Sequence, residues 1–174
     1  MPYEFRCRQR VEFADTDMAG IVHFSNFFRY MERAEHEFLR SLGLSVHAVN
    51  GDDLVSWPRV AADCKYRAPL SFEDELEVHL LVREKRSKSI TYEFRFYKQG
   101  AADLVALGSI TVVCVSIDRA SGRMSAIAIP ESIDQLIEVA PAERLEMEQK
   151  RSKPDPERCG IKRQEKKIVG KKMD

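Results

Sequence analysis

The sequence has no long apolar run, no net charge and little cysteine or tryptophan. No stretch approaches the roughly 20 apolar residues that a membrane-spanning helix needs, so we expect no transmembrane segment. Lys plus Arg and Asp plus Glu both number 28, so the overall charge predicts neither a nucleic-acid nor a membrane partner. The first ten residues lack the apolar core of a secretory signal, and we expect a cytoplasmic protein.

The four cysteines, Cys7, Cys64, Cys114 and Cys159, are far apart in the sequence and include no C-x-x-C pair. This spacing argues against a zinc site and against a disulfide framework, and reduced thiols are the simplest interpretation. The histidines have no metal-ligand spacing either, so we predict no metal and no separate cofactor. The absence of a glycine-rich phosphate loop and of a G-x-S-x-G elbow argues against a P-loop enzyme and a serine hydrolase.

The apolar residues that are present change their spacing along the chain. Between residues 3 and 13 they alternate with charged residues, which is typical of a half-buried strand. Between residues 25 and 42 they recur at helical spacing, with Ser25 or Asn26 available to cap the start and Gly43 to end the helix. The remaining expected elements are strands at 60–66, 76–82, 90–96 and 104–117, a turn at 50–53, and a short helix from Pro130 to about Val139.

One long helix and several closely connected strands predict an α+β fold, in which the helix packs on the apolar face of an antiparallel sheet. We expect residues 1–141 to form this domain. In residues 142–174 the apolar residues thin out, and 11 basic residues face 7 acidic ones. We interpret this stretch as a charged C-terminal extension, partly disordered, with weak membrane or partner binding as an alternative role.

The most informative stretch joins the first strand to the long helix. From Asp15 to Ala34 it reads D-T-D-x-x-G-I-V-x-x-x-N-F-x-x-Y-x-E-x-A. This pattern resembles the 4-hydroxybenzoyl-CoA thioesterase and YbgC-type acyl-CoA thioesterase family, and the resemblance covers about residues 3–138. It implies the hotdog fold, assembly as a homodimer or homotetramer, and hydrolysis of an acyl- or aroyl-CoA to the free acid and CoA, with CoA as part of the substrate.

By this resemblance Asp17 is the catalytic carboxylate, and attack on the thioester and activation of water both stay open as its role. The backbone N–H groups of Phe24 and His23, where the chain enters the helix, are the expected oxyanion donors. Gly20 has no Cβ and is expected to shape the loop and let a ligand approach. Asp15 is expected to hold the loop through backbone N–H groups.

A basic segment that includes Arg86, Lys88 and Ser89 is predicted to form a hairpin between two strands. Arg and Lys suit phosphate, so this hairpin is a candidate site for the phosphates of CoA. The alternative is a solvated hairpin tip without a ligand, because charge runs commonly have that role.

Other residues are secondary candidates for contact with the acyl group. Trp57 and Pro58 fall where they could line an acyl pocket, or they could be ordinary packing residues. On the helix, Glu32 and Glu35 are expected to lie on the solvated face, and Glu32 is a further candidate to approach the acyl group.

Three other functions or mechanisms are compatible with parts of the pattern. A Ser25–His23–Asp17 triad is one alternative within the same loop. The spacing of Asp15 and Asp17 also fits a Mg²⁺-dependent phosphotransferase, but the parallel strand–helix–strand pattern of such enzymes is absent. The main alternative function is a catalytically silent hotdog protein that binds acyl-CoA or acts as a scaffold.

Overall fold

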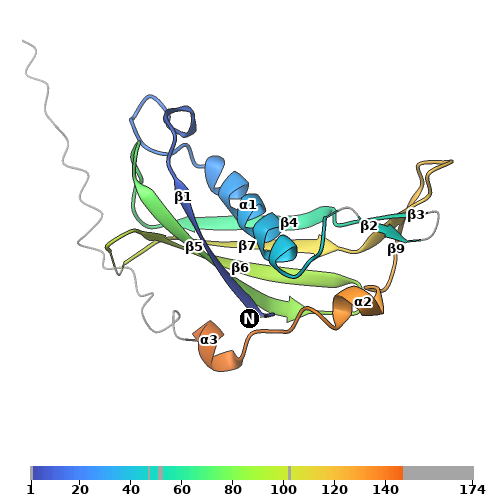
Figure 1. The fold of residues 1–174 in the computed structure, drawn as a ribbon. Coiled ribbons are helices and arrows are strands. Elements are labelled where there is room, and N and C mark those ends of the chain that lie inside the picture. The colour runs from blue at the N-terminus through green and yellow to red at the C-terminus, as the bar shows by residue number, and fades with distance from the viewer. Residues whose placement is uncertain (1, 47, 51–52, 102, 147–174) are drawn as a thin grey trace, which may run out of the picture.

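The structure is a computed structural model, and it describes residues 2–46, 48–50, 53–101 and 103–146 (Figure 1). Its elements, in chain order, are β1 (Glu4–Arg10), the 3₁₀ helix η1 (Phe13–Asp15), α1 (Asn26–Ser41), β2 (Ala48–Asn50), β3 (Asp53–Ser56), β4 (Arg59–Tyr66), β5 (Glu75–Lys85), β6 (Ser89–Lys98), β7 (Leu104–Val113), β8 (Val115–Ile117), β9 (Met124–Ala126), α2 (Glu131–Asp134) and α3 (Ala142–Glu146).

Five strands form one antiparallel sheet in the order β1-β5-β6-β7-β4, and α1 lies across one face of it (Figure 1). The strands β1 and β4 are the two edges of this sheet. A second, smaller sheet has the order β2-β3-β8-β9 and extends beyond one end of the first. The predicted α+β class is confirmed, and the prediction of one long helix on an antiparallel sheet is confirmed in part, because the short helices α2 and α3 are present as well.

The hydrophobic core lies between α1 and the sheet. Alternate residues of β6 face the helix because successive side chains of a strand point to opposite faces. The main buried side chains are Tyr92, Phe94 and Phe96 from β6 and Phe27, Met31, Ala34 and Phe38 from α1.

The helix approaches the sheet closely at Gly108 of β7. A Cβ placed on Gly108 would lie 2.4 Å from the Sδ atom of Met31, which is far inside van der Waals contact. Glycine therefore lets the Met31 side chain rest directly on the strand.

The end of α1 follows the prediction from Gly43. This glycine has a φ of +73°, its N–H donates to the carbonyl of Arg40, and the Leu44 N–H donates to the carbonyl of Leu39. These bonds satisfy the last carbonyls of the helix in the manner of a Schellman motif.

Several other boundaries differ from the prediction. The first strand ends at Arg10, and Phe13 lies in η1 with 77% of its surface exposed, because the chain turns at residues 12–15. The expected strand at 104–117 is divided at Cys114, whose N–H donates to the carbonyl of Lys88. The chain therefore leaves the large sheet as β7 and enters the small one as β8.

The turn predicted at 50–53 falls where β2 ends at Asn50 and its antiparallel partner β3 begins at Asp53, and residues 51 and 52 lie outside the described residues. One short element was predicted incorrectly. The helix after Pro130 ends at Asp134 instead of Val139. Lys85 holds the chain there, since its Nζ atom donates to the carbonyls of Asp134 and Ile137.

The last described helix, α3, is fastened to the sheet face that points away from α1. The side chain of Arg95 leaves β6 on that face, is 3% exposed, and donates to the carbonyls of Arg144 and Leu145. Arg144 in turn pairs with Glu4 of β1 at 3.1 Å. The predicted boundary at residue 141 stays a prediction, and the rest of the expected extension, 147–174, lies outside the described residues.

None of the helices in the described part of the chain is long and apolar enough to cross a membrane.

The contact between Gly108 and Met31 predicts the effect of adding one methyl group. We expect Gly108→Ala to destabilise the fold by about 1–3 kcal/mol, because Met31 must leave its packed position. The same substitution in a Met31→Ala background should cost much less. Denaturant unfolding of wild type, the two single variants and the double variant measures this coupling. An equal loss of unfolding free energy on Gly108→Ala in both backgrounds would contradict the proposed contact between Met31 and Gly108.

Candidate active site

The loop between β1 and α1 presents Asp17 at the surface in a tight turn. The Asp17 N–H donates to the carbonyl of Ile21, and the Gly20 N–H donates to the carbonyl of Asp17, both at 2.9 Å. Gly20 has a φ of +75°, a conformation that glycine adopts without strain, and it therefore shapes the loop as expected. Oδ1 of Asp17 accepts the Ala19 N–H at 2.7 Å, and within the described ranges Asp17 forms no ion pair. This carboxylate is therefore oriented and open to solvent.

Asp15 lies beneath this turn and is 7% exposed. Its carboxylate accepts the Glu12 N–H at 3.0 Å and the Tyr30 hydroxyl at 2.9 Å. Its main-chain carbonyl accepts the His23 N–H at 2.9 Å and the side-chain amide of Asn26 at 2.8 Å. Asp15 thus fastens the loop to α1, and the expected backbone contact is the one from Glu12.

The start of α1 leaves one backbone donor without an acceptor in the described chain, the N–H of Phe24. The His23 N–H, which was expected as a second oxyanion donor, is already bonded to Asp15. The carbonyl of His23 accepts the Asn26 N–H at 2.9 Å, so the Phe24 N–H on the same trans peptide points the opposite way. From β4, the Tyr66 hydroxyl donates to the Phe24 carbonyl at 3.1 Å.

The side chain of His23 lies beside Ser25, with Nδ1 and Oγ 2.8 Å apart. Within the described residues Asp17 makes no hydrogen bond to His23, so the structure does not assemble a Ser25–His23–Asp17 triad. Ser25 does not cap the helix through its side chain. The described residues also contain no group of three or more His, Cys, Asp or Glu that could hold a metal.

A second cluster of charges joins α1 to the first residue of β4. One nitrogen of Arg59, Nη2, lies 2.8 Å from Glu35 and 3.2 Å from Glu32. Glu32 is exposed as predicted, but Glu35 is only 1% exposed and the expectation that it is solvated is wrong. Burial raises the pKa of Glu35 to about 7, against the opposing effect of the Arg59 charge.

Sequence reasoning missed Glu35 and Arg59 as a pair. A signal was available for Glu35, which follows Met31 by four residues and precedes Phe38 by three, on the buried stripe of the helix. Nothing comparable marked Arg59, because its partners are 24 and 27 residues away in the chain.

The basic hairpin forms between β5 and β6 as predicted, but its charges already have partners. The Arg86 N–H closes the turn on the carbonyl of Ser89, and the Arg86 side chain pairs with Glu84 at 2.9 Å. Nζ of Lys88 donates to the carbonyl of Ala126 at 3.1 Å. Both side chains remain largely exposed.

This hairpin lies at the other end of the sheet from Asp17. The loop of residues 11–25, between β1 and α1, is called the reactive loop below. It leaves β1 where Arg10 pairs with Glu75, and the hairpin follows Lys85, ten residues further along β5. At about 3.4 Å per residue this separation is about 34 Å. Within one protomer the structure therefore does not bring Asp17 and the hairpin together.

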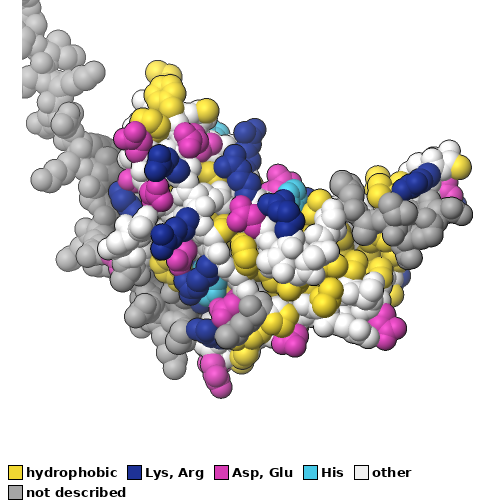
Figure 2. All heavy atoms as spheres, viewed as in Figure 1, with side chains coloured by type: hydrophobic (Ala, Val, Ile, Leu, Met, Phe, Trp, Pro, Cys, Tyr) yellow, Lys and Arg dark blue, Asp and Glu magenta, His cyan; other side chains and the backbone are white. Residues whose placement is uncertain are grey.

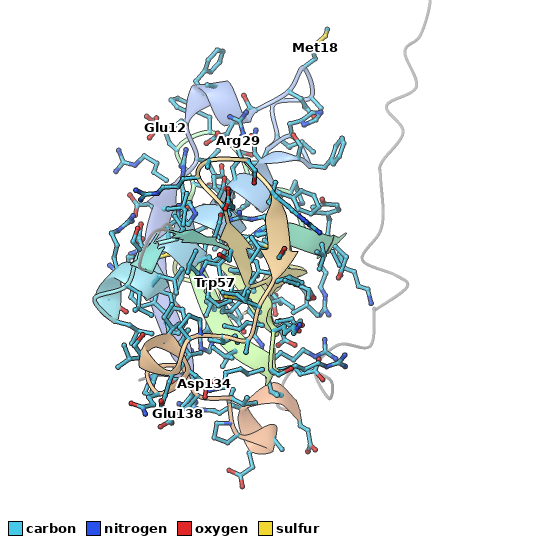
Figure 3. The ribbon with its side chains drawn as sticks, turned by 90° about the vertical axis from the view of Figure 1, so that its right-hand side faces the viewer. Glu12, Met18, Arg29, Trp57, Asp134 and Glu138 are labelled. Atoms are coloured by element: carbon cyan, nitrogen blue, oxygen red, sulfur yellow. The ribbon has the colours of Figure 1, made fainter. Side chains whose placement is uncertain are left out.

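Trp57 and Pro58 precede β4 and lie toward the hairpin end. Trp57 is buried, and the carbonyl of Pro58 accepts the Val113 N–H. Figure 3 shows Met18 of the reactive loop at one end of the molecule and Asp134 at the other, with Trp57 between them. The candidate site residues thus form two groups, one around Asp17 and one that runs from Trp57 to the hairpin.

Comparison with known proteins identifies the family. The profile of the Thioesterase-like superfamily matches residues 11–146. The chain belongs to this superfamily. The predicted hotdog fold and the predicted enzyme class, a thioester hydrolase, are thereby confirmed.

Several proteins similar to this chain are named for activity on CoA thioesters. A 1,4-dihydroxy-2-naphthoyl-CoA hydrolase of Prochlorococcus marinus (strain NATL2A) is 28% identical over 73% of this chain and 84% of its own. The acyl-CoA thioesterase YbgC of Haemophilus influenzae (strain ATCC 51907 / DSM 11121 / KW20 / Rd) is 24% identical over 71% and 87%. The structure of BH1999 gentisyl-coenzyme A thioesterase is 30% identical, covers 77% of this chain and all of its own, and superposes with a TM-score of 0.64.

The burial of Glu35 predicts a pH dependence of stability. Its folded pKa of about 7 lies above the ordinary value of 4.5, so the folded state binds this proton more tightly than the unfolded state. The resulting stability is present below about pH 4.5 and is lost as the pH rises through about 7, by roughly 3 kcal/mol. Glu35→Gln should remove this slope.

The measurement is the unfolding free energy of wild type and Glu35→Gln at several pH values between 4 and 8. Glu32→Gln is the matched control, because Glu32 contacts the same Arg59 but is exposed. A constant difference between wild type and Glu35→Gln across this range would contradict the prediction.

Proposed function

We propose that this protein is an acyl-CoA thioesterase whose reactive carboxylate is Asp17 and whose oxyanion donor is the Phe24 N–H. The observation that carries the proposal is that one loop, between β1 and α1, holds both an oriented, exposed carboxylate and the one backbone donor at the start of α1 that has no acceptor in the described chain. A thioester carbonyl placed between them would meet a base or nucleophile on one side and a hydrogen-bond donor on the other.

The chemistry requires charge to be stabilised on the carbonyl oxygen when the thioester is attacked. The Phe24 N–H lies at the positive end of the α1 dipole, which favours that negative charge. Asp17 acts either as the nucleophile, forming a mixed anhydride that water then hydrolyses to the free acid and the restored carboxylate, or as the base that takes a proton from the attacking water. In both routes CoA leaves as its thiolate, which is a good leaving group because a thiol is a stronger acid than an alcohol.

The acyl group of the substrate is proposed by analogy with the relatives. Two of them are named for hydroxylated aromatic acyl groups, gentisyl and 1,4-dihydroxy-2-naphthoyl, and one for acyl-CoA in general. A hydroxyaroyl-CoA is therefore the first substrate to test, beside aliphatic acyl-CoA esters of several lengths.

We also propose that the site is completed by a second copy of the chain. The strand β4 is an eight-residue sheet edge on which seven residues are exposed, and such an edge offers unpaired N–H and C=O groups to another strand. It runs from Arg59, near Trp57, to Tyr66, which contacts Phe24. Antiparallel pairing of two β4 strands would place Arg59 of each copy near the reactive loop of the other.

The surface beside β4 supports such a contact because it includes several exposed apolar side chains among the charged ones. Exposed apolar residues lie on β4 and on the reactive loop, and side chains of this kind also gather at the tip formed by the loops before α1 (Figure 2). The residues along this surface are Met18, Ile21, Phe24, Val60 and Tyr66. Covering them would remove apolar surface from water and bring the group that includes Trp57 and the hairpin to the Asp17 group of the partner.

The first prediction concerns Asp17 itself. We expect wild type to release free thiol from at least one acyl-CoA, equally with Mg²⁺ and with a chelator. Asp17→Asn should lower kcat/KM by about 100- to 10,000-fold, the range for loss of a general base, without lowering the melting temperature. Asp118→Asn, in the turn between β8 and β9, serves as a control and should keep its activity.

Two results would reject the catalytic assignment. Wild-type turnover by Asp17→Asn would show that another group performs the attack. Binding of acyl-CoA by wild type without thiol release from any member of the panel would instead favour the silent acyl-CoA-binding alternative.

A second prediction tests the shared site by complementation. Arg86→Ala/Lys88→Ala should raise KM for acyl-CoA with little change in kcat, because contacts to the nucleotide do not distinguish substrate from transition state. Consider a mixed assembly that is a dimer of one chain with Arg86→Ala/Lys88→Ala and one chain with Asp17→Asn. If each site takes Asp17 from one chain and the hairpin from the other, one site carries all of these substitutions and the other carries none. At low substrate concentration the mixed assembly should regain about half of the wild-type activity if two sites form per dimer.

The mixed assembly is isolated by two different affinity tags on co-expressed chains. The reference is Asp17→Asn paired with itself under the same tags. Activity no higher than the mean of the two parent variants would show that the hairpin does not act with Asp17 of the other chain, and sedimentation would then establish whether an active monomer exists.

A further inference from the structure

We propose that Tyr30 and Asn26 are positioning residues, which set the distance between Asp17 and the Phe24 N–H through the buried Asp15. This inference rests on the proposed thioesterase function. It assigns a role in turnover to two helix residues that do not themselves face the substrate.

Tyr30 is suited to hold the Asp15 carboxylate in one place. Its side chain is fully buried, and its hydroxyl donates to Oδ2 of Asp15 at 2.9 Å. Burial and the adjacent Asp15 charge keep the pKa of Tyr30 well above its ordinary value, so the hydroxyl retains its proton and remains a donor. The ring is further fixed by an edge-to-face contact with Phe27.

Asn26 binds the main chain of Asp15, whereas Tyr30 binds its carboxylate. The Asn26 side-chain amide donates to the main-chain carbonyl of Asp15 at 2.8 Å, and the His23 N–H donates to that carbonyl as well. The buried side chain of Asn26 therefore connects the first residue of α1 to Asp15, while its main-chain N–H donates to the carbonyl of His23. A hydrogen bond of this kind contributes about 1 kcal/mol to stability. Here the bond from the Asn26 side chain also fixes the position of Asp15 relative to α1.

The two contacts act on the reacting groups over very short chain distances. Asp17 is two residues after Asp15, and the Phe24 N–H belongs to the peptide that follows the Asp15-bonded N–H of His23. A displacement of Asp15 relative to α1 therefore changes the separation between the carboxylate and the oxyanion donor. Misplacement of a reacting group by about 1 Å can cost on the order of 100-fold in rate.

The experiment combines Tyr30→Phe with Asp15→Ala in a double-mutant cycle. Tyr30→Phe removes one oxygen and should lower kcat about 10- to 100-fold, with KM changed less than about two-fold, because the substrate contacts persist. In the Asp15→Ala background, which offers the Tyr30 hydroxyl no side-chain acceptor, the same substitution should change kcat by less than about two-fold, since Tyr30 acts through Asp15. Tyr92→Phe, which alters the other fully buried tyrosine of this core, is the control and should keep its kcat.

A second measurement does not depend on catalysis. The His23 amide should exchange its hydrogen at least about ten-fold faster in Tyr30→Phe than in wild type, whereas the amide of Phe94 in β6 should not change. This arm is readable even if wild type hydrolyses no thioester, so failure of the proposed function and failure of this inference are distinguishable.

Three outcomes would overturn the inference. These are a wild-type kcat for Tyr30→Phe, equal losses in the presence and absence of the Asp15 carboxylate, and unchanged exchange at His23. A fall in kcat that Tyr92→Phe reproduces would also overturn it, because loss of stability alone would then account for the effect.

Discussion

The four hydrogen bonds that Asp15 accepts fix the reactive loop to the helix beneath it. Two come from the main chain of the loop and two from side chains of α1, so neither segment can move without breaking a buried polar contact. A buried carboxylate that loses such partners is destabilised by several kcal/mol in the interior of a protein. The geometry of the exposed Asp17 is thus set by groups that solvent does not reach.

The two groups of candidate residues lie at opposite ends of the five-stranded sheet. One end carries Asp17 and Phe24, and the other carries Trp57 and the basic hairpin, although all of them were expected to surround one substrate. An extended CoA ester is long, but the strands between these ends leave no direct path through the protomer. The exposed edge strand β4 connects the two regions, and a two-fold axis through that strand is the simplest operation that would unite them.

The sequence predicted the larger elements because their signals are local. The alternation before residue 11, the helical spacing from Phe27 to Leu39 and the terminating Gly43 each depend on neighbours within a few positions. The family pattern also directed attention to Asp17, Gly20 and Phe24. The contacts of Tyr30 with Asp15 and of Arg59 with Glu35 join residues 15 and 24 positions apart. Spacing within one sequence does not reveal such pairs, and the break at Cys114 likewise depends on a bond to another hairpin.

The contact of Met31 with Gly108 also bears on where an acyl chain can run. Many small-molecule sites are hollows inside a domain, but here the thioether of a buried methionine occupies the space above the strand, and the neighbouring rings of Phe27 and Phe96 are 5.3 Å apart. An aliphatic tail could therefore pass between helix and sheet at Gly108 only if the Met31 side chain moved aside. The rotamers open to Met31 would then decide how long a tail fits beside this strand.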